Sequence, residues 1–84
     1  MKVVKLDNRH RLFREGMTYA FKFTDHRPER SQVSKILSNM YGWEYCNNRW
    51  RTFYGKKGLY NRTRTYWVGV RNKADVSIVM LKLN

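Results

Sequence analysis

Basic and aromatic side chains are interleaved along one stretch of the sequence that contains no acidic residue. The stretch lies between Glu44 and Asp75. Its basic residues are Arg49, Arg51, Lys56, Lys57, Arg62, Arg64, Arg71 and Lys73, and its aromatic residues are Tyr45, Trp50, Phe53, Tyr54, Tyr60, Tyr66 and Trp67. Lysine and arginine bind phosphates with release of counterions, and unpaired bases stack on aromatic rings for about 1–3 kcal/mol each. The stretch therefore predicts a surface for a polyanion, and nucleic acid, either DNA or RNA, fits both residue types.

Roles for single residues follow from their local sequence. The predicted nucleic-acid contacts are Arg49, Arg51, Lys56, Lys57, Tyr60, Arg62, Arg64 and Arg71. Tyr60 is the predicted stacking ring, and Trp50 is a further candidate for a base contact. Alternation along a strand over residues 49–54 directs Arg49 and Arg51 to one side and Trp50 to the other. The rings expected mainly in the core are Trp50, Trp67, Phe21 and Phe23, because a small domain needs large side chains to fill its interior.

The charge of the whole chain supports an anionic partner. Eighteen Lys and Arg residues stand against six Asp and Glu residues, which gives a formal net charge of +12. A surface that serves solubility alone is normally mixed in sign, whereas a strong field of one sign attracts opposite charge. With about six phosphates neutralised, the logarithm of the affinity should fall against the logarithm of the salt concentration with a slope of about −5.

An acidic protein surface would explain the same charges. The alternative function is therefore a small protein-binding regulator or inhibitor, of the kind that phages and mobile elements encode. Its basic face would dock on an acidic surface or on an assembly that binds nucleic acid. For either function we expect no membrane partner and no small-molecule substrate.

Catalysis has little support in the sequence. The histidines, His10 and His26, have no nucleophile or carboxylate at a telling spacing, and the acidic residues are scattered. A metal-assisted nuclease remains a third reading only if folding brings several carboxylates together. Gly55 and Gly58 match no phosphate-binding glycine motif. We predict no catalytic residue, no metal site and no cofactor.

The cellular compartment is expected to be the cytoplasm. Cys46 is the single cysteine, so it has no partner for an internal disulfide or a structural zinc site. The chain has no apolar run of about 18 to 20 residues, and its N-terminal region lacks the features of a signal peptide.

The elements that would carry these residues belong to one small α+β domain, residues 1–84, because a chain of 84 residues has room for one modest core. Strands are predicted over residues 2–6 and 17–24, with Met17, Tyr19, Phe21 and Phe23 on one buried face. A helix follows over about 28–40, with Pro28 in its first turn and Gly42 beyond its end.

The second half is predicted to be β-rich. One hairpin pairs 43–46 with 49–54 around Asn47 and Asn48, and a second pairs 65–70 with 76–83. Between the hairpins lies a basic loop over 55–64. The expected fold is one antiparallel or mixed sheet of about five to six strands with a single helix packed on one face.

Overall fold

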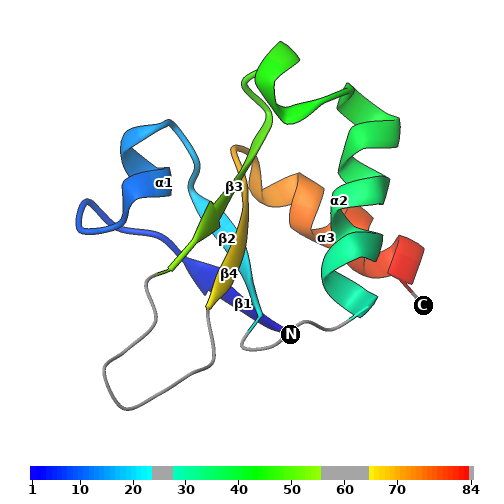
Figure 1. Cartoon of the computed structure of the whole chain (residues 1–84), viewed down its shortest axis with the longest axis horizontal. Coiled ribbons are helices and arrows are strands. Elements are labelled where there is room, and N and C mark those ends of the chain that lie inside the picture. Colours follow the sequence, from blue (N-terminus) through cyan, green and yellow to red (C-terminus); the bar gives the residue numbers. More distant parts are fainter. Residues whose placement is uncertain (24–27, 56–64, 84) are drawn as a thin grey trace.

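The chain forms an antiparallel sheet with helices on both of its faces (Figure 1). The computed structural model describes residues 1–23, 28–55 and 65–83, and within them it has four strands, three α-helices and one short 3-10 helix. In chain order these are β1 (Lys2–Lys5), α1 (Arg11–Arg14), β2 (Tyr19–Phe23), α2 (Pro28–Tyr41), η1 (Glu44–Cys46), β3 (Trp50–Tyr54), β4 (Tyr66–Val70) and α3 (Lys73–Leu83). The spatial order of the strands is β1-β2-β4-β3. The predicted α+β class is confirmed, but the predicted five to six strands and single helix are wrong for the described part of the chain.

One face of the sheet packs against α2 and α3 and forms the main core. Strand alternation turns Phe21, Phe23, Val68, Val70 and Trp50 to this face, and all five are buried. The helices contribute buried aliphatic side chains to the same core, Val33 and Leu37 from α2 and Val79 from α3. The predicted helix is confirmed: α2 ends at Tyr41, and Gly42 follows with a φ of +86°, a backbone conformation that favours glycine.

The opposite face is covered at one end by α1. Leu6, Leu12, Met17 and Ala20 form a second buried cluster there. Gly69 of β4 lies directly beneath this cluster, because a Cβ atom at this position would be 3.0 Å from side-chain atoms of both Leu12 and Met17. The absence of a side chain at Gly69 thus lets α1 sit close to the sheet.

Met17 does not share the face of Phe21, as the sequence pattern predicted. The backbone N–H of Met17 donates to the carbonyl of Leu12 at 3.0 Å, so this residue belongs to the turn that follows α1. Strand β2 begins only at Tyr19. Met17 therefore packs in the second cluster, and the strand alternation applies from Tyr19 onward.

The predicted C-terminal strand is an α-helix. Residues 76–83 were expected to pair with 65–70, but they lie in α3, whose Val76, Val79 and Leu83 face the main core. These positions follow the helical spacing i, i+3 and i+7. The helix is also anchored at its first turn, where the carboxylate of Asp75 accepts a hydrogen bond from the Tyr41 hydroxyl at 2.5 Å.

The predicted hairpin around Asn47 and Asn48 is also wrong. Residues 44–46 form η1, and the Asn47 amide donates to the carbonyls of Tyr41 and Trp43 at 3.1 and 2.7 Å. Asn47 thus satisfies carbonyls at the end of α2 instead of forming a tight turn between strands. The strand predicted over 49–54 pairs with β4, so the hairpin that forms is β3–β4, with segment 55–65 between its strands.

Candidate functional site

Two lysines and two aromatic rings form a continuous row across the sheet. Lys2 pairs with Lys22, Lys22 with Trp67, and Trp67 with Phe53 in the register of the four strands. Paired residues of neighbouring strands point to the same side of a sheet. We call Lys2, Lys22, Trp67 and Phe53 the open-face row, because they lie on the face opposite α2 and α3 and beside the end that α1 covers.

Cationic groups lie over both rings of this row. The Lys22 ammonium is 5.1 Å from the centre of the Trp67 ring, and the Arg11 guanidinium is 5.8 Å from the centre of the Phe53 ring. Trp67 and Phe53 are half-buried, while Arg11 is exposed. The row therefore combines accessible ring surface with positive charge within a few ångströms, which is the combination that binds anions carrying flat groups.

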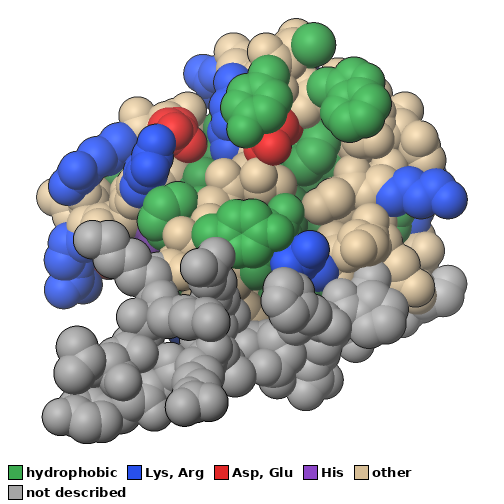
Figure 2. Space-filling model, viewed as in Figure 1, with side chains coloured by type: hydrophobic (Ala, Val, Ile, Leu, Met, Phe, Trp, Pro, Cys, Tyr) green, Lys and Arg blue, Asp and Glu red, His purple; other side chains and the backbone are tan. Residues whose placement is uncertain are grey.

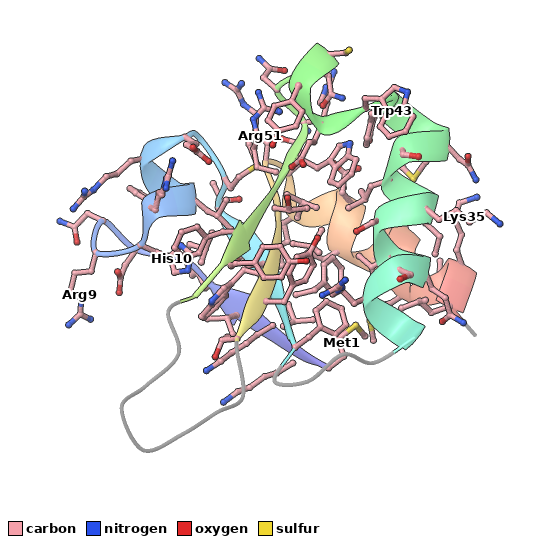
Figure 3. All side chains as sticks on the ribbon, in the orientation of Figure 1. Met1, Arg9, His10, Lys35, Trp43 and Arg51 are labelled. Atoms are coloured by element: carbon pink, nitrogen blue, oxygen red, sulfur yellow. The ribbon has the colours of Figure 1, made fainter. Side chains whose placement is uncertain are left out.

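His10 holds the two rings from the side of α1. Its ring centre is 4.5 Å from that of Trp67 and 5.5 Å from that of Phe53, in edge-to-face geometry (Figure 3). Its Nδ1 accepts a hydrogen bond from the backbone N–H of Leu12 at 3.1 Å, so His10 also caps α1. Burial lowers the pKa of His10, and the imidazole is neutral at pH 7. No sequence pattern links this histidine to either ring, because the contact depends on the tertiary fold.

Arg51, predicted as a phosphate contact, is engaged within the protein. Its guanidinium donates to the backbone carbonyls of Glu44, Asn47 and Trp50, and the side chain is half-buried. These bonds tie η1 to β3 (Figure 3). Arg51 therefore has a structural role that its place in a basic strand did not reveal.

Arg49 and Arg71 are exposed and lie next to each other on paired chain segments. The backbone N–H of Arg71 donates to the carbonyl of Arg49 at 2.9 Å. The Arg49 guanidinium lies 5.5 Å from the centre of the Tyr41 ring. In the β3–β4 register this pair is at the opposite end from Tyr54 and Tyr66, so the structure places it away from the ring end of the open-face row.

The other predicted contacts, Lys56, Lys57, Tyr60, Arg62 and Arg64, lie outside the described residues. The segment that contains them joins Gly55 to Thr65, and these two residues are connected by a backbone hydrogen bond of 2.7 Å. Trp50 is 5% exposed, and its indole N–H donates to the Gly42 carbonyl at 3.0 Å. Trp50 is a core residue, as the strand alternation predicts.

A groove of about 740 Å³ adjoins the open-face row at the edge of β3. The residues that line it are Arg11, Glu15, Glu44, Tyr45, Arg51, Thr52, Phe53, Tyr54 and Tyr66. Figure 2 shows hydrophobic and acidic side chains close together on the face drawn there. Arg11 and Phe53 belong both to the groove and to the surroundings of the row, so the two features form one continuous surface.

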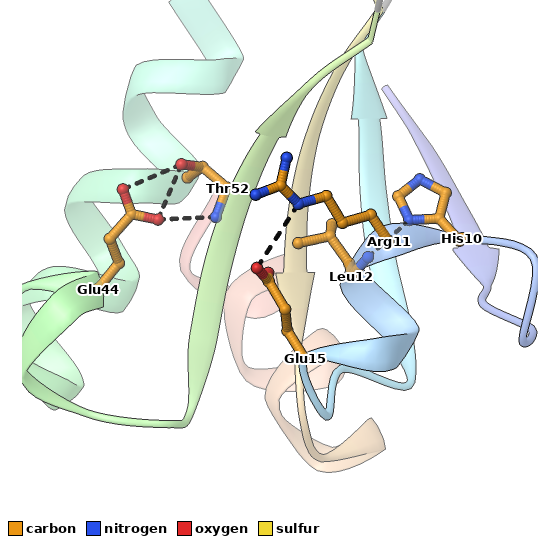
Figure 4. Close-up of polar contacts among 6 residues, drawn as sticks. All are labelled: His10, Arg11, Leu12, Glu15, Glu44 and Thr52. Carbon is orange, nitrogen blue, oxygen red and sulfur yellow. Dashed lines mark hydrogen bonds and ion pairs between the residues drawn. The ribbon is translucent and has the colours of Figure 1, made fainter.

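Acidic side chains at this groove are held by the protein itself. The Glu44 carboxylate accepts hydrogen bonds from the backbone N–H of Thr52 at 2.7 Å and from its hydroxyl at 2.8 Å (Figure 4). Glu15 pairs with Arg11, with 3.8 Å between Oε1 and Nε. Burial raises the pKa of Tyr66, whose hydroxyl lies within hydrogen-bonding reach of the Ser34 and Thr52 side chains.

Asp75 forms a separate polar contact on the helical side. It is 2% exposed, and its partner Tyr41 has a raised pKa because its hydroxyl donates to the Asp75 carboxylate. This bond joins α2 to α3. Among the residues that the structure describes, no group of three or more His, Cys, Asp or Glu residues is arranged to hold a metal ion.

Comparisons with models of known protein families, with curated proteins and with solved structures found no match. In the described ranges, no helix has the length and apolar character needed to cross a membrane.

Proposed function

We propose that this protein binds single-stranded nucleic acid across the open face of its sheet. The observation that carries the proposal is the open-face row, which places two lysines and two partly exposed rings side by side on four strands. Neighbouring strands are about 4.8 Å apart, so the row extends about 14 Å across the sheet. A strand of nucleic acid can lay bases on the two rings while its phosphates approach the lysines.

The preference for a single strand follows from the role of the rings. Bases inside a duplex are stacked on each other and hide their faces, whereas unpaired bases are free to stack on Trp67 and Phe53. A protein that used only its charge would bind duplex and single strand alike. The half-buried rings therefore favour the single-stranded form.

Further charge is available next to the row in the sequence. Lys56, Lys57, Arg62 and Arg64 belong to the segment between Gly55 and Thr65, which connects the strands that carry Phe53 and Trp67. The net charge of +12 adds a long-range attraction for any polyanion. In this proposal the charges supply affinity for any nucleic acid, and the rings supply the preference for single strands over duplexes.

The proposal is tested by fluorescence anisotropy with single-stranded and duplex DNA and RNA of equal length, titrated at several salt concentrations. Single strands should bind more tightly than duplexes, and their affinity should fall with salt by about 0.7 in slope for each phosphate neutralised. Lys22→Gln should weaken binding and lower that slope by about 0.7. The matched control is Lys35→Gln on the exposed side of α2, which points away from the sheet (Figure 3) and should change neither value. If Lys22→Gln and Lys35→Gln changed the affinity and the salt slope equally, the phosphate contact would not be at Lys22.

Binding to another protein is a second candidate, and a different surface favours it. Trp43 is 79% exposed and Tyr45 is 86% exposed, on either side of Glu44 at the start of η1. Exposed tryptophan and tyrosine side chains are common anchors of protein interfaces. A pull-down from nuclease-treated lysate distinguishes the candidates, because a stoichiometric partner that depends on Trp43 would survive the nuclease.

A further inference from the structure

Strand β3 is an edge strand, and the hydrogen-bonding phase of the β3–β4 pair fixes which of its backbone groups face outward. Arg71 N–H donates to the Arg49 carbonyl, and Gly55 N–H donates to the Thr65 carbonyl. Hydrogen-bonded and non-hydrogen-bonded pairs alternate in antiparallel strands. Residues 51 and 53 therefore bond to β4, whereas the backbone groups of Trp50, Thr52 and Tyr54 point away from it. Thr52 and Tyr54 line the groove.

The first part of this edge is closed by side chains of the protein. The Trp50 carbonyl accepts a hydrogen bond from the Arg51 guanidinium at 2.9 Å, and the Thr52 N–H donates to Glu44. A peptide strand that added itself along β3 would have to displace both side chains. The edge is therefore a poor site for an additional β-strand, even though the groove beside it is large enough for a ligand.

An acceptor and a donor that follow one another along this edge stay open beside the groove. The Thr52 carbonyl and the Tyr54 N–H have no hydrogen-bond partner among the described residues, and both lie on the strand that lines the groove. Aromatic surface is beside them, because Tyr54 is 48% exposed and Tyr45 also lines the groove. An acceptor and a donor on one strand edge, next to rings, match a small planar ligand that carries one donor and one acceptor on its own edge.

We propose that this open pair, Thr52 C=O and Tyr54 N–H, reads one nucleobase of the strand that is bound on the open-face row. The inference rests on the proposed function and identifies the base class. Cytosine and adenine offer an exocyclic amino group to the Thr52 carbonyl and a ring nitrogen to the Tyr54 N–H. Arg11 and Phe53 connect the groove to the row, so a strand that leaves the row at Phe53 enters the groove directly.

Glu15 gives the groove a preference among bases. Its carboxylate lines the groove beside Arg11 (Figure 4), and a carboxylate accepts hydrogen bonds but cannot donate them. An amino group has a second hydrogen to offer this carboxylate. Thymine and uracil can also bond to the open pair, through their ring N–H and one carbonyl oxygen. Their second carbonyl oxygen, next to that N–H, has no hydrogen to offer the carboxylate and is repelled by it. The groove should therefore prefer bases with an amino group over thymine and uracil.

The test compares oligo(dT) with the same oligonucleotide carrying one central cytosine or adenine, by competition in fluorescence anisotropy. The amino-bearing oligonucleotides should bind more tightly, by a factor between about 5 and 150 for one well-formed pair of hydrogen bonds. Glu15→Gln should narrow this ratio. Asp7→Asn is the matched control, because it removes the same charge from a residue paired with Arg9 outside the groove, and it should leave the ratio unchanged.

Three results would overturn parts of the proposal and can be told apart. Equal affinity for all oligonucleotides would refute the base preference while the proposed function stands. Equal narrowing by Glu15→Gln and Asp7→Asn would refute the role of Glu15, since net charge alone would explain it. The lack of binding to any oligonucleotide would refute the proposed function itself. Circular dichroism of each variant establishes that the fold is retained before affinities are compared.

Discussion

Two tryptophans on neighbouring strands give the sharpest test of the open-face row. Trp67 is half-buried on the open face with the Lys22 ammonium above its ring, whereas Trp50 is buried in the main core. We expect Trp67→Leu to lower affinity for single-stranded nucleic acid and Trp50→Leu to lower stability. Leucine keeps an apolar side chain in both places, so the variants differ in location and not in chemistry.

The magnitudes follow from the two environments. Loss of one base–aromatic stack removes about 1–3 kcal/mol of binding free energy, which corresponds to a factor of about 5 to 150 in affinity. Trp50→Leu leaves a cavity and frees the Gly42 carbonyl that its indole N–H now satisfies. Its expected cost in unfolding free energy is about 2–4 kcal/mol, below that of a full truncation of an aromatic residue to alanine. Trp67→Leu should cost less stability, because its ring is only partly buried.

Chemical denaturation and anisotropy measure the two effects separately. Unfolding in guanidinium chloride gives the stability of each variant, and anisotropy is then measured where each variant is folded. The reasoning fails if Trp67→Leu binds within a factor of two of the original protein, or if Trp50→Leu loses affinity to the same extent while fully folded. The first result would remove Trp67 from the interface, and the second would show a general loss of structure.

Three further perturbations follow from single contacts. Because burial lowers the pKa of His10, the unfolded chain binds a proton at this site more readily than the folded chain does. The stability that neutral His10 contributes should be fully present above about pH 6.5 and be lost as the pH falls through the lower pKa of the folded state. Thermal melts across this pH range test the idea, and an identical pH dependence in His10→Gln would contradict it. Gly69→Ala should destabilise the protein by about 1–3 kcal/mol, since the added methyl group meets the α1 cluster at 3.0 Å, and an unchanged denaturation midpoint would contradict this packing. Glu44→Ala should free the Thr52 N–H and promote self-association of the protein through β3. Sedimentation velocity would detect the resulting dimer. A variant that stays monomeric at high concentration would argue against Glu44 as the group that blocks this strand edge.

Local sequence signals were sufficient for the elements with clear boundaries. Helix α2 has proline in its first turn and Gly42 after its end, and both features act within one or two turns of the chain. Strand β2 was predicted from the alternation of apolar and polar residues, and β4 from its run of aromatic and β-branched residues. These signals depend on neighbours in sequence, so no tertiary information was needed.

The C-terminal helix was missed because its apolar residues surround it. Val76, Val79 and Leu83 form the stripe that packs on the core, but Met80 and Leu81 are exposed. The exposed apolar residues hide the stripe in the sequence, and the β-branched content then favours a strand. The helical spacing of the three core positions was the signal that could have found it.

The candidate site was predictable only in its chemistry. Basic and aromatic residues pointed to nucleic acid, but Trp67 was expected mainly in the core and Lys22 was not selected at all. Their pairing depends on β2 lying beside β4, a long-range contact that no local pattern reports. Arg51 was selected for its charge, while its bonds to three carbonyls depend on the path of η1.

The strand order β1-β2-β4-β3 also constrains how the chain reaches this structure. Strand β4 lies between β2 and β3 and pairs with both, so β2 and β3 cannot join one sheet until β4 is present. During synthesis, the sheet cannot close before residues 66–70 have left the ribosome, and loop closure across α2 and β3 must precede it. A fragment of residues 1–55 should therefore be unfolded alone and should recover its sheet when a peptide that spans β4 and α3 is added.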